Sequence, residues 1–194
     1  MKIYFLQACL IFLAFFGSNT VSAQNYYWVG TTGGNWSDLS NWSNTSGGAG
    51  GFYATPPGAL ARVRFDANSF NSLGQIVNYD AGATSIKSMF WTTGADAPQF
   101  IGVSANDSIS INGSLILDPL MDYDYDGKLI FKGGNNDSIV TSGILLLNDV
   151  IVNTFGTNLK LNDNLTTTGG FYYLRGGLFL NNRTVNCSFF NASQ

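Results

Sequence analysis

The 194-residue chain has a formal net charge of −3, from nine Lys and Arg against twelve acidic residues, and it contains no His. All twelve acidic residues are Asp, so a Ser-His-Asp or Cys-His nucleophile, a His-ligated zinc site and a Glu acid or base are excluded. The charges also lack the basic stripe that nucleic-acid binding requires. Abundant Gly, Asn, Ser, Thr and aromatic residues favour β-structure over helices.

Residues 1–23 have the pattern of a secretory signal peptide. Lys2 precedes an apolar run over residues 3–16, and the small residues Ser22 and Ala23 precede the expected cleavage point. The apolar run is too short to be a membrane span. We therefore expect a mature chain that begins at Gln24, has no membrane span, and is secreted or displayed at the cell surface.

Residues 24–61 form an aromatic and Gly-rich region, and residues 44–58 within it read as a loop because Gly and Pro interrupt regular structure. Trp28, Trp36 and Trp42 stand close together here. Exposed, they would form a carbohydrate-binding platform; buried, they would form a cap over the first coil of the domain that follows. The cap is favoured, because Trp buries a large apolar area wherever a core needs closing.

Residues 62–194 are predicted to form short strands separated by Gly, Asn and Asp. Examples of the expected strands are residues 62–65, 75–79, 108–111, 128–131, 159–161 and 177–180. An Asn-Asp pair followed by an apolar residue and a later Gly begins at Asn106, and it recurs at Asn136 and Asn162. Such repetition favours a right-handed parallel β-helix, or β-solenoid, whose corners Asn and Asp can occupy. A β-sandwich would use the same turn residues and is the alternative.

Asp122, Asp124 and Asp126 alternate with Tyr123 and Tyr125, and Gly127 follows them. Carboxylates at alternate positions before a Gly match the first half of a calcium-binding loop, although the Glu expected at its end is missing. The alternative is a strand with both Tyr residues inward and the Asp residues in solvent. Together with Asp118, the same carboxylates are also candidates for the acid and base of a polysaccharide hydrolase or lyase.

Cleavage after Ala23 would leave Cys187 as the sole cysteine, so no intramolecular disulfide is expected. Val185, Cys187 and Phe189 alternate with polar residues. This pattern predicts that the thiol lies on the buried face of a strand, where cysteine behaves as a small apolar residue.

Several segments resemble large secreted, adhesin-like proteins of Bacteroidota. YWVG at 27–30, GNWSDLSNW at 34–42 and RFDANSF at 64–70 resemble the amino-terminal block of these proteins, and GKLIFKG at 127–133 and LKLNDNL at 159–165 resemble their repeat coils. The resemblance implies an extracellular or cell-surface protein, exported by type IX secretion and carrying further repeat domains. Such proteins end in a sorting domain, which is not evident before Gln194. The sequence therefore predicts an amino-terminal piece of a longer product, or the product of a truncated gene.

The leading hypothesis is a non-catalytic, structural segment of an adhesin-like surface protein. A carbohydrate-binding module that uses Trp28, Trp36 and Trp42 to hold an extracellular polysaccharide or cell-surface glycan is the first alternative. A polysaccharide lyase or hydrolase that uses Asp122, Asp124 and Asp126 is the second. No cofactor is expected, apart from the calcium ion that the same three Asp residues would bind.

Overall fold

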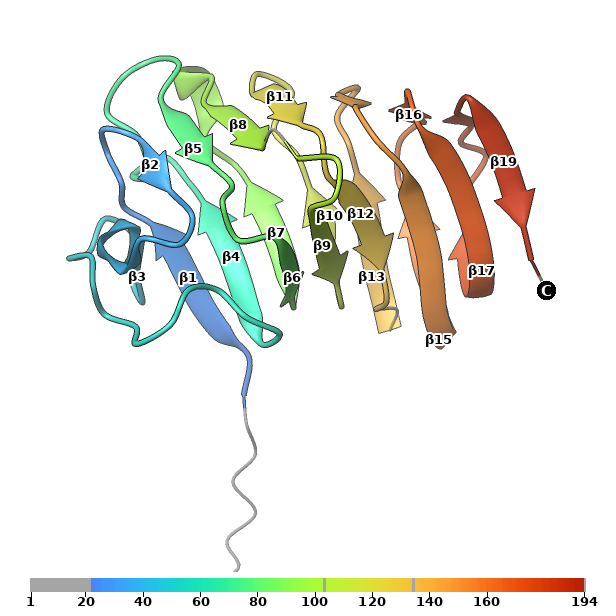
Figure 1. Cartoon of the computed structure of the whole chain (residues 1–194), viewed down its shortest axis with the longest axis horizontal. Coiled ribbons are helices and arrows are strands. Elements are labelled where there is room, and N and C mark those ends of the chain that lie inside the picture. The colour runs from blue at the N-terminus through green and yellow to red at the C-terminus, as the bar shows by residue number, and fades with distance from the viewer. Residues whose placement is uncertain (1–21, 103, 134, 194) are drawn as a thin grey trace, which may run out of the picture.

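The computed structural model describes residues 22–102, 104–133 and 135–193, so most of the expected signal peptide lies outside the described residues. The chain is an all-β protein whose parallel strands stack as a β-solenoid of about five turns (Figure 1). This confirms the predicted parallel solenoid over the β-sandwich. In the described part of the chain, no helix is long and apolar enough to cross a membrane.

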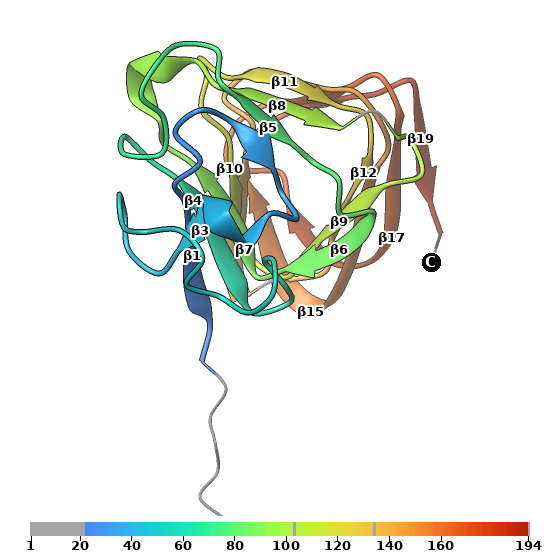
Figure 2. The same cartoon turned by 60° about the vertical axis from the view of Figure 1, so that its left-hand side comes forward.

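Each coil has three sides, which surround a common interior (Figure 2). Side one contains β1 (Gln24–Trp28), β4 (Ala61–Phe65), β7 (Ser88–Trp91), β10 (Leu115–Ile116) and β13 (Asn135–Val140). Side two contains β2 (Gly34–Asn35), β5 (Ile76–Asn78), β8 (Gln99–Gly102), β11 (Asp122–Tyr125), β14 (Leu145–Leu146), β16 (Leu165–Thr167) and β18 (Val185–Asn186). Side three contains β6 (Ala83–Ile86), β9 (Ser108–Ile111), β12 (Lys128–Phe131) and β19 (Phe189–Ala192).

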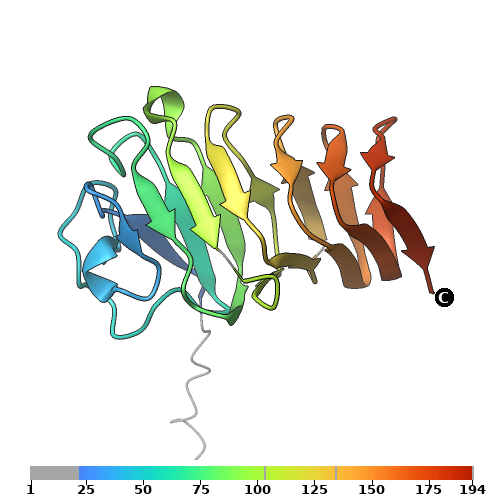
Figure 3. The same cartoon turned by 45° about the horizontal axis from the view of Figure 1, so that its top comes forward.

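Two long strands, β15 (Val150–Leu161) and β17 (Gly170–Phe179), continue from side three into side one. The first half of β15 pairs with β12 on side three, and its second half pairs with β13 on side one. These strands therefore merge two sides into one sheet of twelve strands. Figure 3 shows the coils following one another from the N-terminal to the C-terminal end of the solenoid.

The coils shorten along the chain. On side one, paired residues in successive coils are 26, 26, 24, 22 and 19 positions apart; the pairs are Val63–Met89, Met89–Leu115, Leu115–Ile139, Ile139–Leu161 and Lys160–Phe179. The 30-residue spacing of the Asn-Asp motif is therefore not the length of a coil. The spacing of the motif exceeds the number of residues in a coil by roughly the length of one side. Each copy of the motif therefore lies on a different side from the copy before it.

The three copies of the motif do lie on three different sides. The apolar residue of the first copy, Ile109, is in β9 on side three; Ile139 of the second is in β13 on side one; Leu165 of the third is in β16 on side two. The motif is thus a corner followed by a strand, which fits every side of the coil. The prediction of a solenoid was right, but the repeat that suggested it was not the coil itself.

The interior is filled by the inward residues of the alternating strands. Strand β4 shows the pattern clearly, because Ala61, Val63 and Phe65 are buried whereas Arg62 and Arg64 face outward. Aromatic rings dominate the N-terminal half of the interior, and aliphatic residues dominate much of the C-terminal half. The register places like side chains above one another, so the core is a continuous column.

The amino-terminal region is built into this column. Strand β1 pairs in parallel with β4, and β2 pairs with β5, so residues 24–35 already follow the path of a coil. The short 3-10 helix η1 (Leu39–Asn41) then leads into β3 (Trp42–Ser43), which pairs antiparallel with the outer edge of β1. The antiparallel strand covers an edge that would otherwise offer unpaired backbone groups.

The last described coil is open on its outer side. A cavity of about 680 Å³ lies within it, lined by residues of β17 and of the segment 180–190. Phe190 lines the cavity and is 62% exposed, and Cys187 lines it as a half-buried free thiol. The prediction that Cys187 lies on the buried face of a strand was only partly right: Cys187 follows β18, is half-buried and packs against the core.

Candidate functional site

The three tryptophans of the amino-terminal region form one buried cluster. Trp28, Trp36 and Trp42 are each 0% exposed. The ring of Trp42 lies edge-to-face between the others, with centroids 5.1 Å from Trp28 and 5.0 Å from Trp36. Phe65 from the next coil packs against all three rings. The cluster is therefore the cap of the aromatic core.

The prediction of a carbohydrate-binding platform at Trp28, Trp36 and Trp42 is wrong. A sugar stacks on an exposed ring face, and the faces of these rings are covered by other side chains. Two of the indole groups also donate within the cap, from Trp28 Nε1 to the carbonyl oxygen of Gly30 (3.1 Å) and from Trp42 Nε1 to that of Trp36 (2.8 Å). These bonds satisfy the polar edges of the Trp28 and Trp42 rings.

Asp122 and Asp124 lie on the exposed face of β11, and Asp126 follows the strand in solvent. Tyr123 and Tyr125 point into the core, as the strand alternative required. Alternate residues of a strand are about 7 Å apart, so these carboxylates cannot gather around one ion at the distance calcium needs. Within the described ranges, no group of three or more His, Cys, Asp or Glu side chains is arranged to hold a metal ion. The interpretation as a calcium loop is therefore wrong.

Asp118, the fourth carboxylate considered for catalysis, is 7% exposed and is used as a structural acceptor. Its Oδ2 accepts from the backbone N–H of Gly94 (3.0 Å) and from the Thr93 hydroxyl (3.2 Å), and its Oδ1 accepts from the N–H of Leu120 (3.0 Å). A carboxylate that accepts from these three donors is held in one orientation at a corner. It is on the corner before β11 and does not share the exposed face of the other three.

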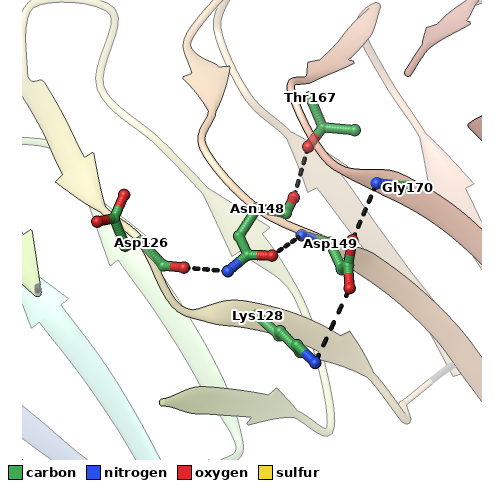
Figure 4. Close-up of polar contacts among 6 residues, drawn as sticks. All are labelled: Asp126, Lys128, Asn148, Asp149, Thr167 and Gly170. Atoms are coloured by element: carbon green, nitrogen blue, oxygen red, sulfur yellow. Dashed lines mark hydrogen bonds and ion pairs between the residues drawn. The ribbon is translucent and has the colours of Figure 1, made fainter. Parts of the chain in front are cut away.

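The corner between sides two and three carries a network of polar contacts (Figure 4). The Asn148 amide donates to the carbonyl oxygen of Asp126 in the preceding coil, and the hydroxyl of Thr167 in the following coil donates to the carbonyl oxygen of Asn148 (2.5 Å). Asn148 Oδ1 accepts from the N–H of Asp149 (2.7 Å). One Asn therefore links three successive coils.

Asp149 continues this corner network (Figure 4). Its Oδ1 accepts from the backbone N–H of Gly170 in the next coil (2.9 Å), and its Oδ2 lies 3.9 Å from Lys128 Nζ. The hydrogen bond to a backbone donor is the stronger contribution, because the Lys128 side chain is 42% exposed and an ion pair in contact with solvent adds little.

Aspartates serve the same purpose elsewhere on the solenoid, both at other corners and within strands. Six of the twelve Asp side chains accept a hydrogen bond from a neighbouring coil: Asp80 from Ser37, Asp118 from Thr93 and Gly94, Asp122 from Gln99, Asp137 from Ser114, Asp149 from Gly170, and Asp163 from Thr141 and Ser142. The acidic residues are therefore spread along the solenoid as links between coils. They do not converge on one reaction centre.

Buried tyrosines occupy the interior behind β11. Burial raises the pKa of Tyr79 to about 12, and it also raises the pKa of Tyr123 and of Tyr125. Tyr79 donates from its hydroxyl to the carbonyl oxygen of Gly82 (2.8 Å), whereas the Tyr125 hydroxyl has no hydrogen-bond partner among the described residues. These phenols stay protonated at neutral pH and are core residues.

The outward face of β4 was not singled out from the sequence, although its alternation contained the signal. Because Val63 and Phe65 point inward, Arg62 and Arg64 must share the outward face. The guanidinium carbon of Arg64 lies 5.0 Å from the ring centroid of Phe90 and 5.9 Å from that of Tyr27. No ion pair joins either Arg to a carboxylate in the described part of the chain.

No family model, curated protein or solved structure matches this chain. Its function is therefore argued from the geometry of these residues.

Proposed function

We propose that this chain is a non-catalytic, structural segment of a secreted or cell-surface adhesin-like protein. The observation that carries the proposal is the use of its polar side chains: half of the Asp residues, together with Asn148, bind neighbouring coils. A solenoid linked in this way at its corners is suited to act as a stiff support that displays loops or other domains.

Two further observations support a structural role. The aromatic cap removes Trp28, Trp36 and Trp42 from solvent, and it covers the edge of the first coil. The exposed Asp122, Asp124 and Asp126 stand in a row on one face, which is not the facing arrangement of an acid and a base across a sugar bond. The pattern of residues 1–23 supports export, and the resemblance to adhesin-like proteins supports a surface location.

The location is tested by producing the full chain in a bacterium and by sequencing the amino terminus of the product. We expect a mature chain that begins at Gln24 and that is released to the medium or removed from intact cells by added protease. A chain that keeps residues 1–23 and stays inside protease-treated cells would contradict the proposal.

The absence of catalysis is tested with the purified chain and a panel of polysaccharides. We expect no new reducing ends and no unsaturated sugar ends after prolonged incubation. Release of either product by the wild-type chain, and its loss in Asp124→Asn, would overturn the structural proposal in favour of a lyase or hydrolase.

A further inference from the structure

We propose that the outward face of β1, β4 and β7 binds an acidic polysaccharide, with Arg62 and Arg64 contacting its carboxylates and Tyr27 and Phe90 its sugar rings. The inference rests on the proposed extracellular role, because such polymers are met outside the cell. These three strands are neighbours at the amino-terminal end of side one (Figures 1 and 2).

The register places the outward residues of these strands in two rows. Tyr27 is paired with Arg64, and Arg64 with Phe90, so an aromatic ring, a guanidinium and a second ring follow one another along the solenoid axis. Asn25 is paired with Arg62 in the neighbouring row. Parallel strands are about 4.8 Å apart, which is comparable with the length of one sugar residue in an extended glycan. A glycan that lies along the solenoid axis would thus place one sugar residue over each strand.

Arg64 is held in place before any ligand binds. Its Nε donates to Asn25 Oδ1 (3.0 Å), and its guanidinium lies between the rings of Tyr27 and Phe90. The other N–H groups of this guanidinium make no hydrogen bond to a described residue and remain for a carboxylate. A fixed Arg loses little conformational entropy on binding, and its planar fork suits a carboxylate.

Arg62 supplies the free positive charge of the face. Its side chain is exposed and makes no hydrogen bond, ion pair or ring contact with the described residues. The nearest acid along the strand, Asp66, accepts from the backbone N–H of Asn68 (2.9 Å) and does not form an ion pair with Arg64. Two adjacent cations without carboxylate partners, on a chain of net charge −3, favour an anionic occupant.

The flanking aromatic rings favour a sugar polymer over a simple anion as the ligand of this face. Tyr27 and Phe90 are partly exposed beside the cations, in contrast to the buried tryptophans of the cap. Apolar Ile116 and Val140 continue the same row in the next two coils, so the face extends along the axis as a stripe. A stripe with cations at one end fits an extended acidic glycan better than a compact ligand.

The test is native gel electrophoresis of the purified chain through gels that contain polygalacturonate, with fully methyl-esterified polygalacturonate as the uncharged form of the same polymer. We expect polygalacturonate to retard the wild-type chain and the esterified polymer to leave its mobility unchanged. Arg62→Gln should weaken the affinity roughly tenfold or more, because a bond to a charged group is lost. The affinity of Arg62→Lys should lie between those of the wild type and Arg62→Gln, since lysine keeps the charge but loses the planar fork of the guanidinium.

Lys132→Gln is the matched control, because Lys132 is exposed and its removal changes the net charge by the same amount elsewhere on the solenoid. Lys132→Gln should bind polygalacturonate like the wild-type chain. Both Lys132→Gln and Arg62→Gln should have the melting temperature of the wild type. Equal weakening by Arg62→Gln and Lys132→Gln, equal retardation in dextran sulfate, or no retardation in polygalacturonate would overturn this site. Since the assay uses purified protein, these outcomes do not depend on where the chain is located, which the export experiment decides separately.

Discussion

The carboxylate of Asp149 accepts a hydrogen bond from the backbone N–H of Gly170, 2.9 Å away in the next coil (Figure 4). The two residues are 21 positions apart in the sequence, which is one coil. A side chain at one corner thereby satisfies a backbone donor of the following coil. Bonds of this kind supplement the strand pairing where the chain turns and the sheets are interrupted.

Asp149→Ala should lower the free energy of unfolding by about 1–3 kcal/mol, because the Gly170 N–H would lose its charged acceptor. Urea denaturation followed by circular dichroism measures the change. Lys128→Gln is the control and should cost no more than about 1 kcal/mol, since it breaks only an exposed ion pair. If Lys128→Gln were the more damaging substitution, the ion pair rather than the backbone hydrogen bond would hold this corner.

The aromatic cap predicts an order among its tryptophans. Trp42→Phe should destabilise the protein more than Trp36→Phe, by about 0.5–1.5 kcal/mol, because Trp42 Nε1 donates to the Trp36 carbonyl oxygen whereas Trp36 Nε1 has no partner among the described residues. Both substitutions remove a similar ring volume from a fully buried site. Melting temperatures of the two variants provide the comparison, and the reverse order would show that packing alone sets the cost.

Close contact between coils predicts the effect of a methyl group at Gly169. A Cβ atom there would lie 2.5 Å from the backbone carbon of Asn148, so Gly169→Ala must separate two coils and should cost about 1–3 kcal/mol or more. Gly58→Ala is the matched control, because a Cβ atom at Gly58 has no neighbour within 4 Å. Chemical denaturation of both variants tests the difference, and equal midpoints would mean that the coils can move apart at little cost.

The buried tyrosines predict a loss of stability in alkali. In the unfolded chain a phenol ionises near pH 10. In the folded chain, burial raises the pKa of Tyr79 to about 12 and also raises the pKa of Tyr125. Above pH 10 the unfolded state loses protons that the folded state retains, so stability present below pH 10 falls as the pH rises through these raised values.

Tyr125→Phe isolates part of that effect. The Tyr125 hydroxyl has no partner among the described residues, so the substitution should be nearly neutral at pH 8 and should reduce the loss of stability between pH 10 and 11.5. Urea midpoints measured at both ends of that range test it. The same alkaline loss in wild type and variant would indicate that Tyr125 does not contribute.

The sequence was sufficient for the class of fold and for the position of several strands, although it did not predict the long strands β15 and β17. The strand alternative for residues 122–126 correctly placed Tyr123 and Tyr125 inward and the Asp residues in solvent, because neighbours on a strand point to opposite faces whatever the strand packs against. Asn at several corners also behaves as expected: Asn136, Asn181 and Asn182 have positive φ angles of 60°, 49° and 59°.

The sequence did not predict the surroundings of a residue wherever one sequence pattern is compatible with several positions in the coil. The motif glycines look equivalent, yet Gly113 and Gly169 have no room for a Cβ atom, whereas Gly143 has open space and a φ of 83°. Their strands lie on different sides of the coil, so each meets different neighbours. Likewise, the dense tryptophans of residues 28–42 suit either a cap or a platform until the packing of Phe65 against them is known.

Residue periodicity and turn chemistry, which act over a few residues, thus determined that this chain is a parallel β-solenoid with Asp and Asn at its corners. Only the tertiary structure decided that Trp28, Trp36 and Trp42 are buried, that half of the Asp side chains link coils, and that Arg62 and Arg64 remain beside Tyr27 and Phe90 on an outward face. The physical reason is that these outcomes depend on the register between coils. That register is set by contacts between residues 19 to 43 positions apart.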